Sequence, residues 1–266
     1  MGSASLEIVA AGAAFDAVAG SFDDAFDPWL SVAAQRASVR EELLIAFPAG
    51  ASLLEIGGGT GTDAAWMIER RREVFLTDAA PAMVAEAARK IGARRCEALP
   101  AERLGELANR GLSFDGAYSN FAALNCVSDL APVARALADL VRPGGKLVLV
   151  LFGTCCPGEV LVELARGRPR NCLRRFRREQ LTASLRGRRF TIRYHRRADL
   201  ERCFAPTFRL TSAKAVGLFV PPSAAEPWIS RRPRLLAALE AADGLLARRL
   251  AWLGDHVAYV FERVTP

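Results

Sequence analysis

The chain has 266 residues, of which 51% are hydrophobic, and its formal net charge is +7. This length and composition suit one large α/β domain with a substrate-covering addition, because two independent domains would each be small. No apolar run reaches the roughly 18 residues that cross a bilayer. No basic n-region precedes an apolar stretch at the N-terminus, so a secretory signal is not indicated and a cytoplasmic location is expected.

The first part of the chain is predicted to be mainly helical. Residues 1–14 are small and alanine-rich, and we expect a loosely docked tail there. Phe15 and Phe22 lie seven residues apart, which places them near one face of a helix. Residues 31–47 carry apolar side chains on one side and are followed by Pro48, so they predict a helix that packs against a sheet.

A strand, a glycine turn and a helix are predicted between Ala51 and Ala64. Residues 52–56 form a short apolar run, the sequence GGGTG follows, and a helix begins near Thr62. Glycines let a ligand approach the backbone closely, and the helix N-terminus offers free N–H groups to an anion. The flanking sequence lacks the Gly-Lys-Ser/Thr ending of a triphosphate loop and the third glycine of a dinucleotide fingerprint. Nucleoside triphosphates are therefore disfavoured, and the case for NAD is weak.

Two carboxylates flank this turn. Glu55 ends the first strand, where its charge would attract an ammonium or sulfonium group and repel a pyrophosphate. Residues 74–77 predict a second strand, which Asp78 ends, and Pro81 begins a helix over residues 81–91. The distance of Asp78 from the glycines suits an acid that holds the two hydroxyls of a ribose.

Glu55, the GGGTG turn and Asp78 together resemble the class I S-adenosylmethionine-dependent methyltransferases. The closest pattern is similar to the ubiquinone/menaquinone-biosynthesis type of small-molecule methyltransferase, and the likeness covers about residues 50–152. It implies an α/β, Rossmann-like, seven-stranded and mostly parallel sheet sandwiched by helices, with S-adenosyl-L-methionine as cofactor. It also implies a helical cap from the N-terminus and from C-terminal insertions.

The resemblance also implies site residues. Phe15 and Phe22 stand where such enzymes often carry tyrosine in a lid, although a helix that packs these rings into the core is equally open. Glu97 precedes Leu99-Pro100 and is the candidate for the adenine amino group, with a solvated surface carboxylate as the alternative. The expected cofactor-binding residues are Phe15, Phe22, Glu55, Gly57, Gly58, Gly59, Thr60, Gly61, Asp78, Ala79, Met83, Glu97 and Asn120.

Three residues are candidates for catalysis. Tyr118 and Asn120 lie at the C-terminal end of a predicted strand over residues 112–119, at the sheet edge where ligands bind; core packing and turn capping are their alternative roles. His195 and His256 are the two histidines of the chain, and His256 follows Asp255, with which it could pair. Either histidine could be a base or a structural group, and a base is optional because a sulfonium methyl is already electrophilic.

The remaining elements divide the chain into three regions. We expect a lid over residues 1–48, a cofactor-binding core over 49–153, and a completion of the sheet over 154–266 that carries an arginine-rich cap. The further elements predicted are strands over 93–97, 146–152, 214–220 and 257–264, a turn over 142–145, and helices over 130–141, 158–165 and 234–250.

The positive charge is concentrated in residues 166–202. This segment holds 14 arginines, no lysine and three acids, which leaves the remainder of the chain at −4. Apolar residues at roughly helical spacing predict one basic amphipathic helix or two short ones, which with the insertion before the last strand would cap the acceptor site. The arginines could clamp an anionic acceptor, seat the protein on an anionic membrane surface, hold RNA, or form a solvated face.

These observations leave three functions open. A small-molecule methyltransferase acting on an apolar or anionic specialised metabolite is favoured. An RNA methyltransferase is the alternative, although nucleic acid is an unlikely partner because few aromatic residues accompany the arginines. A binding module that keeps the fold without methylating is the third. The six cysteines show no metal spacing, so reduced thiols and no metal site are expected.

Overall fold

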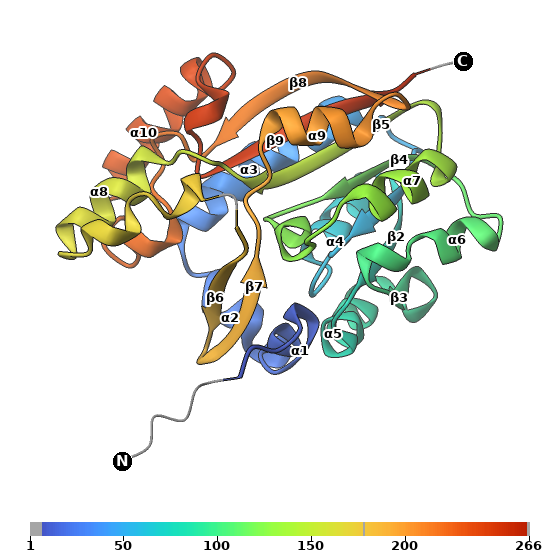
Figure 1. Ribbon diagram of the computed structural model, residues 1–266, viewed down its shortest axis with the longest axis horizontal. Coiled ribbons are helices and arrows are strands. Elements are labelled where there is room, and N and C mark those ends of the chain that lie inside the picture. Colours follow the sequence, from blue (N-terminus) through green and yellow to red (C-terminus); the bar gives the residue numbers. More distant parts are fainter. Residues whose placement is uncertain (1–6, 178, 265–266) are drawn as a thin grey trace.

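The computed structural model describes residues 7–177 and 179–264, which form an α/β fold built on a seven-stranded sheet (Figure 1). The strand order is β3-β2-β1-β4-β5-β9-β8, in which β9 runs antiparallel to both of its neighbours and the pairs from β3 to β5 are parallel. The strands are β1 (Ser52–Ile56), β2 (Glu73–Asp78), β3 (Cys96–Ala98), β4 (Phe114–Ser119), β5 (Val141–Phe152), β8 (Phe208–Val216) and β9 (His256–Arg263). The predicted fold class is confirmed.

Helices cover both faces of this sheet. They are α1 (Ala11–Asp16), α2 (Phe22–Phe26), α3 (Leu30–Ala46), α4 (Thr62–Glu69), α5 (Pro81–Ile91), α6 (Gly105–Asn109), α7 (Ala131–Leu140), α8 (Pro157–Ala165), α9 (Arg197–Phe204) and α10 (Pro233–Leu246). One face packs against α3, α4 and α5, and the other against α6, α7 and α9. Between residues 147 and 151 alternate side chains of β5 enter the two cores, as expected for a strand buried on both faces.

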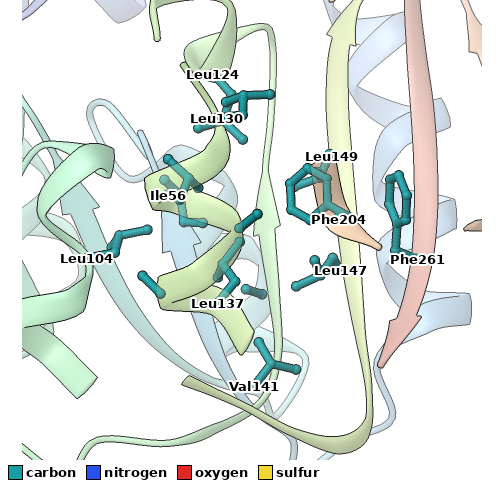
Figure 2. Packing of buried hydrophobic residues seen from close by; sticks show 14 of the residues in the cluster. Ile56, Leu104, Leu124, Leu130, Leu137, Val141, Leu147, Leu149, Phe204 and Phe261 are labelled. Atoms are coloured by element: carbon teal, nitrogen blue, oxygen red, sulfur yellow. The ribbon is translucent and has the colours of Figure 1, made fainter. Parts of the chain in front are cut away.

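The core on the α7 face is shown in Figure 2. Leu137 of α7 packs with Leu147 and Leu149 of β5, and Phe204 of α9 lies beside Phe261 of β9, with ring centroids 5.1 Å apart. Burial of such side chains stabilises the fold by roughly 1.5–3 kcal/mol each. This packing stabilises the sheet, and the candidate active site lies at the carboxyl ends of its strands.

Three strands differ clearly from their predicted ranges. The strand predicted over residues 214–220 is β8, which covers Phe208–Val216. Residues 93–95 form a 3₁₀ turn, so β3 begins only at Cys96. The stretch over 142–145, predicted as a turn, lies inside β5, which pairs with β4 from Val141 onward across a register irregularity. Gly145 permits this pairing, because a Cβ there would lie 2.6 Å from the carbonyl oxygen of Asp115.

The arginine-rich segment does not form the predicted amphipathic helix. Strands β6 (Leu181–Leu185) and β7 (Arg188–Ile192) make a separate antiparallel hairpin. Among the described residues of the segment, Pro169–Asn171 and Arg174–Phe176 form short 3₁₀ helices, and α-helix begins only at Arg197, in α9. Arg186 and Gly187 join the strands with φ of 46° and 85°, which matches the two positive φ angles of a tight hairpin turn. The apolar residues of the hairpin recur at every second position, as in a strand, so the predicted helical period was wrong.

The hairpin holds the N-terminal residues in place. The backbone N–H of Val9 donates a hydrogen bond to the carbonyl of Arg189 at 2.8 Å, and Phe15 packs on Phe190 with ring centroids 5.6 Å apart. Figure 1 shows α1 and α2 beside β6 and β7. Residues 7–14, predicted to be a loosely docked tail, are therefore docked; residues 1–6 lie outside the described part of the chain.

The insertion before β9 lies elsewhere. Its helix α10 packs against α3, through a cluster that joins Leu236 to Ile229 and Ala34. None of its residues lines the cavity described below, so the expectation that it caps the acceptor site was wrong. In the described part of the chain, no helix combines the length and apolar character that a membrane span needs.

Candidate active site

A cavity of about 1070 Å³ lies at the carboxyl ends of β1, β2 and β4, where open α/β sheets bind ligands. Its wall is formed by the glycine turn, the ends of these strands, α1 and α2, the loops over residues 99–102 and 120–127, residues 171–177 and the hairpin. A single-ligand pocket has roughly 300–1,000 Å³. The cavity is therefore large enough for two small molecules side by side.

The glycine turn forms one wall of the cavity. Gly57 and Gly58 both donate to the carbonyl of Thr77, at 2.8 and 3.1 Å, which presses the turn against β2. A Cβ on Gly58 would lie 2.5 Å from Leu76, so only glycine fits there. Gly61 is the N-cap residue of α4 and has a φ of 76°. It packs against Ala87 and does not line the cavity. The turn thus presents its backbone to a ligand, as the sequence predicted.

Glu55 lies at the floor of this end of the cavity. It is 1% exposed, and its Oε2 has no hydrogen-bond partner among the described residues. Burial raises the pKa of this carboxyl well above its usual range, and the charge of Asp63 raises it further. The hydroxyl of the neighbouring Tyr118 opposes this shift. Because Glu55 lines the cavity, a cationic ligand group beside its carboxyl would favour the ionised form, so the residue fits an ammonium group.

Asp78 is held at the end of β2 by two backbone donors. Its Oδ2 accepts from the N–H of Gly59 and its Oδ1 from the N–H of Ala80, both at 2.8 Å. Burial raises the pKa of this carboxyl, although the two donors oppose the shift. Each oxygen keeps a further lone pair for a hydroxyl, so the side chain is oriented to hold a vicinal diol.

Asp63 and Asn120 form a second polar pair at this end. Asp63 accepts from Arg40 at 2.8 Å and from the amide nitrogen of Asn120 at 3.1 Å. The carbonyl oxygen of Asn120 has no partner among the described residues, although the atom is buried. Asp63 follows the glycine turn as an acid in the first turn of α4, and that sequence signal could have identified it.

The N-terminal cover is fastened to the glycine turn. Asp23 of α2 accepts from the hydroxyl of Thr60 and from the ammonium of Lys90, both at 2.6 Å. Phe15 and Phe22 line the cavity and pack together with Met83 of α5. Both phenylalanines therefore lie where a lid over the cofactor end would place them.

The opposite end of the cavity is aromatic and basic. Phe152 and Tyr194 line it together with Arg174, Arg175 and Arg177, whereas Phe190 lines the cavity beside Phe15 of the cover. The rings of Phe152 and Tyr194 lie 5.7 Å apart, centroid to centroid. This end suits a flat or apolar molecule that carries a negative group.

Arg175 is the hub of this basic end. It is 5% exposed and pairs with Glu159 at 2.5 Å and with Asp255 at 2.6 Å. It also donates to the carbonyl oxygen of Gly153 at 3.1 Å. Burial alone would raise the pKa of Asp255, but His256 and Arg175 hold it well below its usual range. The guanidinium therefore ties three chain segments together.

Eleven of the thirteen predicted cofactor residues line the cavity. They are Phe15, Phe22, Glu55, Gly57, Gly58, Gly59, Thr60, Asp78, Ala79, Met83 and Asn120. Gly61 shapes the turn from behind, and Glu97 does not reach the cavity because it pairs with Arg110 at 2.7 Å. Residues 99–102 line the cavity instead.

The structure does not bring the three catalytic candidates to the cavity wall. Tyr118 is still inside β4, so its ring is fully buried in the core, 6.2 Å from that of Phe47. His195 is buried with its Nε2 3.2 Å from the carbonyl of Val127, and burial lowers its pKa. His256 stacks on the far side of Phe152 and makes the expected pair with Asp255, at 3.4 Å.

Other functional positions were missed. Ala10–Ala13 and the hairpin line the cavity through contacts between segments that are distant in the sequence. Cys126 also lines it, and burial raises the pKa of its thiol to about 12, so it is not a ready nucleophile. All six cysteines are free in the structure. Among the described residues, no cluster of three or more histidine, cysteine or acidic side chains could hold a metal ion.

Comparisons with known proteins agree with this geometry. Residues 54–147 match the family model described as a methyltransferase domain. No protein with curated annotation matches the chain. Many solved structures share the fold, and three of them illustrate the likeness.

The first is a putative S-adenosylmethionine-dependent methyltransferase from Listeria monocytogenes, with 14% identity, 88% of this chain and 98% of that chain covered, and a TM-score of 0.58. The second is 1,6-didemethyltoxoflavin-N1-methyltransferase from Burkholderia thailandensis, solved with 1,6-didemethyltoxoflavin and S-adenosylhomocysteine (20% identity, 96% and 89% covered, TM-score 0.55). The third is the putative methyltransferase solved with the Trm112 methyltransferase activator of Haloferax volcanii (15% identity, 96% and 97% covered, TM-score 0.57).

Identities of this size show a common fold, which is the seven-stranded architecture described above. The buried carboxyl of Glu55, the glycine cradle and the oriented carboxylate of Asp78 fit S-adenosylmethionine. The chain therefore has the fold of the class I S-adenosylmethionine-dependent methyltransferases, and its residues 54–147 match the model of a methyltransferase domain.

Proposed function

We propose that this protein transfers a methyl group from S-adenosylmethionine to a small apolar molecule that carries a negative group. The supporting observation is the division of one cavity into an acidic end beside the glycine turn and an aromatic, basic end beside Arg174 and Arg177. A cofactor held by Glu55 and Asp78 would leave the part of the cavity lined by Phe152 and Tyr194 for the acceptor.

Bound S-adenosylmethionine would supply an electrophilic methyl group on its sulfonium. Glu55 would then hold the ammonium of the cofactor, and Asp78 would hold its ribose hydroxyls. The cover made by α1, α2 and the hairpin would exclude water from the space between the two ends. The contribution of the chain is thus mainly orientation, which is worth several kcal/mol for such a displacement.

The lining also bears on how the acceptor is activated. Burial raises the pKa of the Tyr194 hydroxyl and of the Cys126 thiol, so neither is suited to remove a proton near neutral pH. Arginines beside the acceptor would instead favour an acceptor that is already ionised, such as a carboxylate or a phenolate. A pocket of this kind therefore selects acceptors by charge and does not need a general base.

Two finer assignments belong to the same proposal. Of the predicted lid over residues 1–48, we assign the covering role to α1 and α2, because α3 packs against the sheet. The narrower likeness to the ubiquinone/menaquinone-biosynthesis type stays a prediction. RNA methylation and a non-methylating module gain no specific support from the described residues.

Calorimetric titration with S-adenosylmethionine tests the cofactor site. We expect Asp78→Ala to reduce the affinity at least about tenfold, because it removes the acceptor for two hydroxyls. Glu97→Ala is the matched control, since this acid at the end of the adjacent strand lies outside the cavity. Unchanged affinity of the Asp78 variant would contradict the assignment.

Mass spectrometry tests the reaction. The protein is incubated with S-adenosylmethionine and a panel of apolar carboxylic acids, phenols and their neutral analogues. Products that are 14 mass units heavier, with S-adenosylhomocysteine released in equal amount, are expected among the anionic acceptors. Cofactor binding without turnover on any of them would favour a binding module.

A further inference from the structure

The surface beside the cavity carries an unusual set of exposed apolar side chains. Leu161 and Leu164 of α8 are 68% and 52% exposed, and Leu173 and Phe176, shortly after it, are 67% and 49% exposed. Scattered apolar residues are normal on a protein surface, but four large ones within 16 residues are not. We call the following group the α8 patch: Leu161, Leu164, Leu173, Phe176, Arg166, Arg168, Arg174 and Arg177.

In this region the acidic side chains are buried and the arginines of the α8 patch are exposed. The two acids between residues 157 and 177, Glu159 and Glu163, are both buried and face inward, where they pair with arginine and asparagine side chains. The four arginines of the α8 patch are exposed. The apolar side chains of the α8 patch are therefore accompanied by positive charge: Arg174 and Arg166 pair with these two acids, whereas Arg168 and Arg177 make no ion pair among the described residues.

The segments of the α8 patch are joined to one another. Arg174 donates to Glu159 of α8 at 2.7 Å, and Asn171 donates to Glu163 at 2.7 Å. These contacts hold residues 171–177 against α8, which lies at the left edge of the molecule in Figure 1. Asn171, Arg174 and Arg177 also line the cavity, so the patch borders the acceptor end.

We infer that the α8 patch docks on the surface of an anionic lipid bilayer. Anionic headgroups complement the arginines, and the acyl region just below them accepts the leucine and phenylalanine side chains. A protein partner fits less well, because the binding hot spots of protein interfaces are poor in leucine, and three of the four apolar residues are leucine. This docking does not depend on the methyl-transfer proposal.

Vesicle sedimentation of the full chain tests this inference. The protein is mixed with vesicles of phosphatidylcholine alone or with phosphatidylserine added at about a third of the lipid, and the bound fraction is measured against lipid and salt concentration. We expect binding to the anionic vesicles that weakens as salt rises, and little binding to the neutral ones.

Two variants locate the contact. Leu161→Ser with Leu164→Ser should weaken partition at least about tenfold, because two side chains no longer enter the acyl region. Arg168→Gln should weaken it roughly fivefold, the equivalent of one arginine near an anionic surface. Neither change touches a residue that lines the cavity.

Two exposed residues of other elements serve as matched controls. Ile45→Ser removes an apolar side chain that is also 68% exposed, at the end of α3, and Arg94→Gln removes an exposed arginine. Both controls should partition like the wild type, and the midpoint of thermal unfolding shows that each variant is folded. Absence of binding to anionic vesicles, or equal loss in patch and control variants, would overturn the inference. Retention on an acidic protein but not on vesicles would assign the α8 patch to a protein partner instead.

Discussion

The two ends of the cavity carry opposite charges and are built in different ways. The end beside the glycine turn comes from residues 55–83, and its acids Glu55 and Asp78 keep unused acceptor capacity. The far end comes from distant segments, and its central cation, Arg175, is already paired with Glu159 and Asp255. Side chains with free hydrogen-bonding capacity can bind a ligand, whereas side chains in a fully paired network stabilise the cavity wall.

The largest effect is expected from breaking the completed network. Arg175→Met leaves Glu159 and Asp255 buried without their main partner, which typically lowers the free energy of unfolding by about 3–5 kcal/mol. Urea denaturation of the two proteins measures the difference. Arg177→Met is the control, because this exposed neighbour should change stability by less than about 0.5 kcal/mol. Equal losses in both variants would show that Arg175 is no structural hub.

The next largest effect is expected from Glu55→Gln, which replaces a buried carboxyl at the cofactor end by a neutral amide. The folded-state pKa of Glu55 is raised above its unfolded value, so its contribution to stability is complete below the unfolded pKa and is lost as pH rises through the folded pKa. The variant escapes this loss. Without cofactor it should be about 1–3 kcal/mol more stable than the wild type at high pH, with the gain vanishing near pH 4.

The same variant should bind S-adenosylmethionine more weakly, because a neutral amide replaces the partner of its ammonium group. Calorimetry at fixed pH measures the affinity, and thermal unfolding between pH 4 and 9 measures the stability difference. A stability gain that does not depend on pH would show that the Glu55 side chain stays neutral throughout.

A smaller effect is expected at the basic end. Arg177→Met should lower kcat/KM for a carboxylated acceptor about tenfold, since it removes one charged hydrogen-bond donor, and should spare the neutral analogue. Arg188→Met is the matched control, because Arg188 is exposed on the hairpin but does not line the cavity. Equal effects on charged and neutral acceptors would remove Arg177 from acceptor recognition.

The smallest effect is expected at the fastening of the cover. Lys90→Met breaks a partly exposed pair with Asp23, of a kind worth about 0.2–1 kcal/mol. Hydrogen exchange over residues 11–26 should become faster while the sheet is unaffected. Arg197→Met is the control, because it removes an exposed ion pair with Glu201 within α9, which packs against α7 and β8, so exchange over residues 11–26 should stay unchanged.

The same contrast decides how much the sequence could reveal. The acidic end follows from a local order of strand, glycine turn, helix and strand, so Glu55, Asp78 and the turn were predicted from spacing alone. Most strands of the sheet were predicted from their apolar runs, and the seven-stranded architecture was implied by the resemblance to the methyltransferases. Asp63 was within reach of the same reasoning, as an acid at the start of α4.

The basic end of the cavity could not be predicted from local sequence spacing, and the cause is physical. The side chains of residues 181–192 fit both a helical and a strand period, and the positive φ of Arg186 that closes the hairpin has no clear sequence signal. The packing of Phe15 on Phe190 joins parts of the chain that are 175 positions apart in the sequence. The catalytic candidates failed because being near a strand end does not show which way a side chain points, as Tyr118 illustrates.

The hairpin shares no strand pairing with the large sheet among the described residues, and it contacts the N-terminal helices and the loop after β4. Its residues can therefore be exchanged without disturbing the nucleotide-binding strands. Hairpins of different length or polarity grafted between Gln180 and Arg193 should therefore leave the sheet folded, provided that the contact of Phe190 with Phe15 is kept so that the N-terminal cover stays in place.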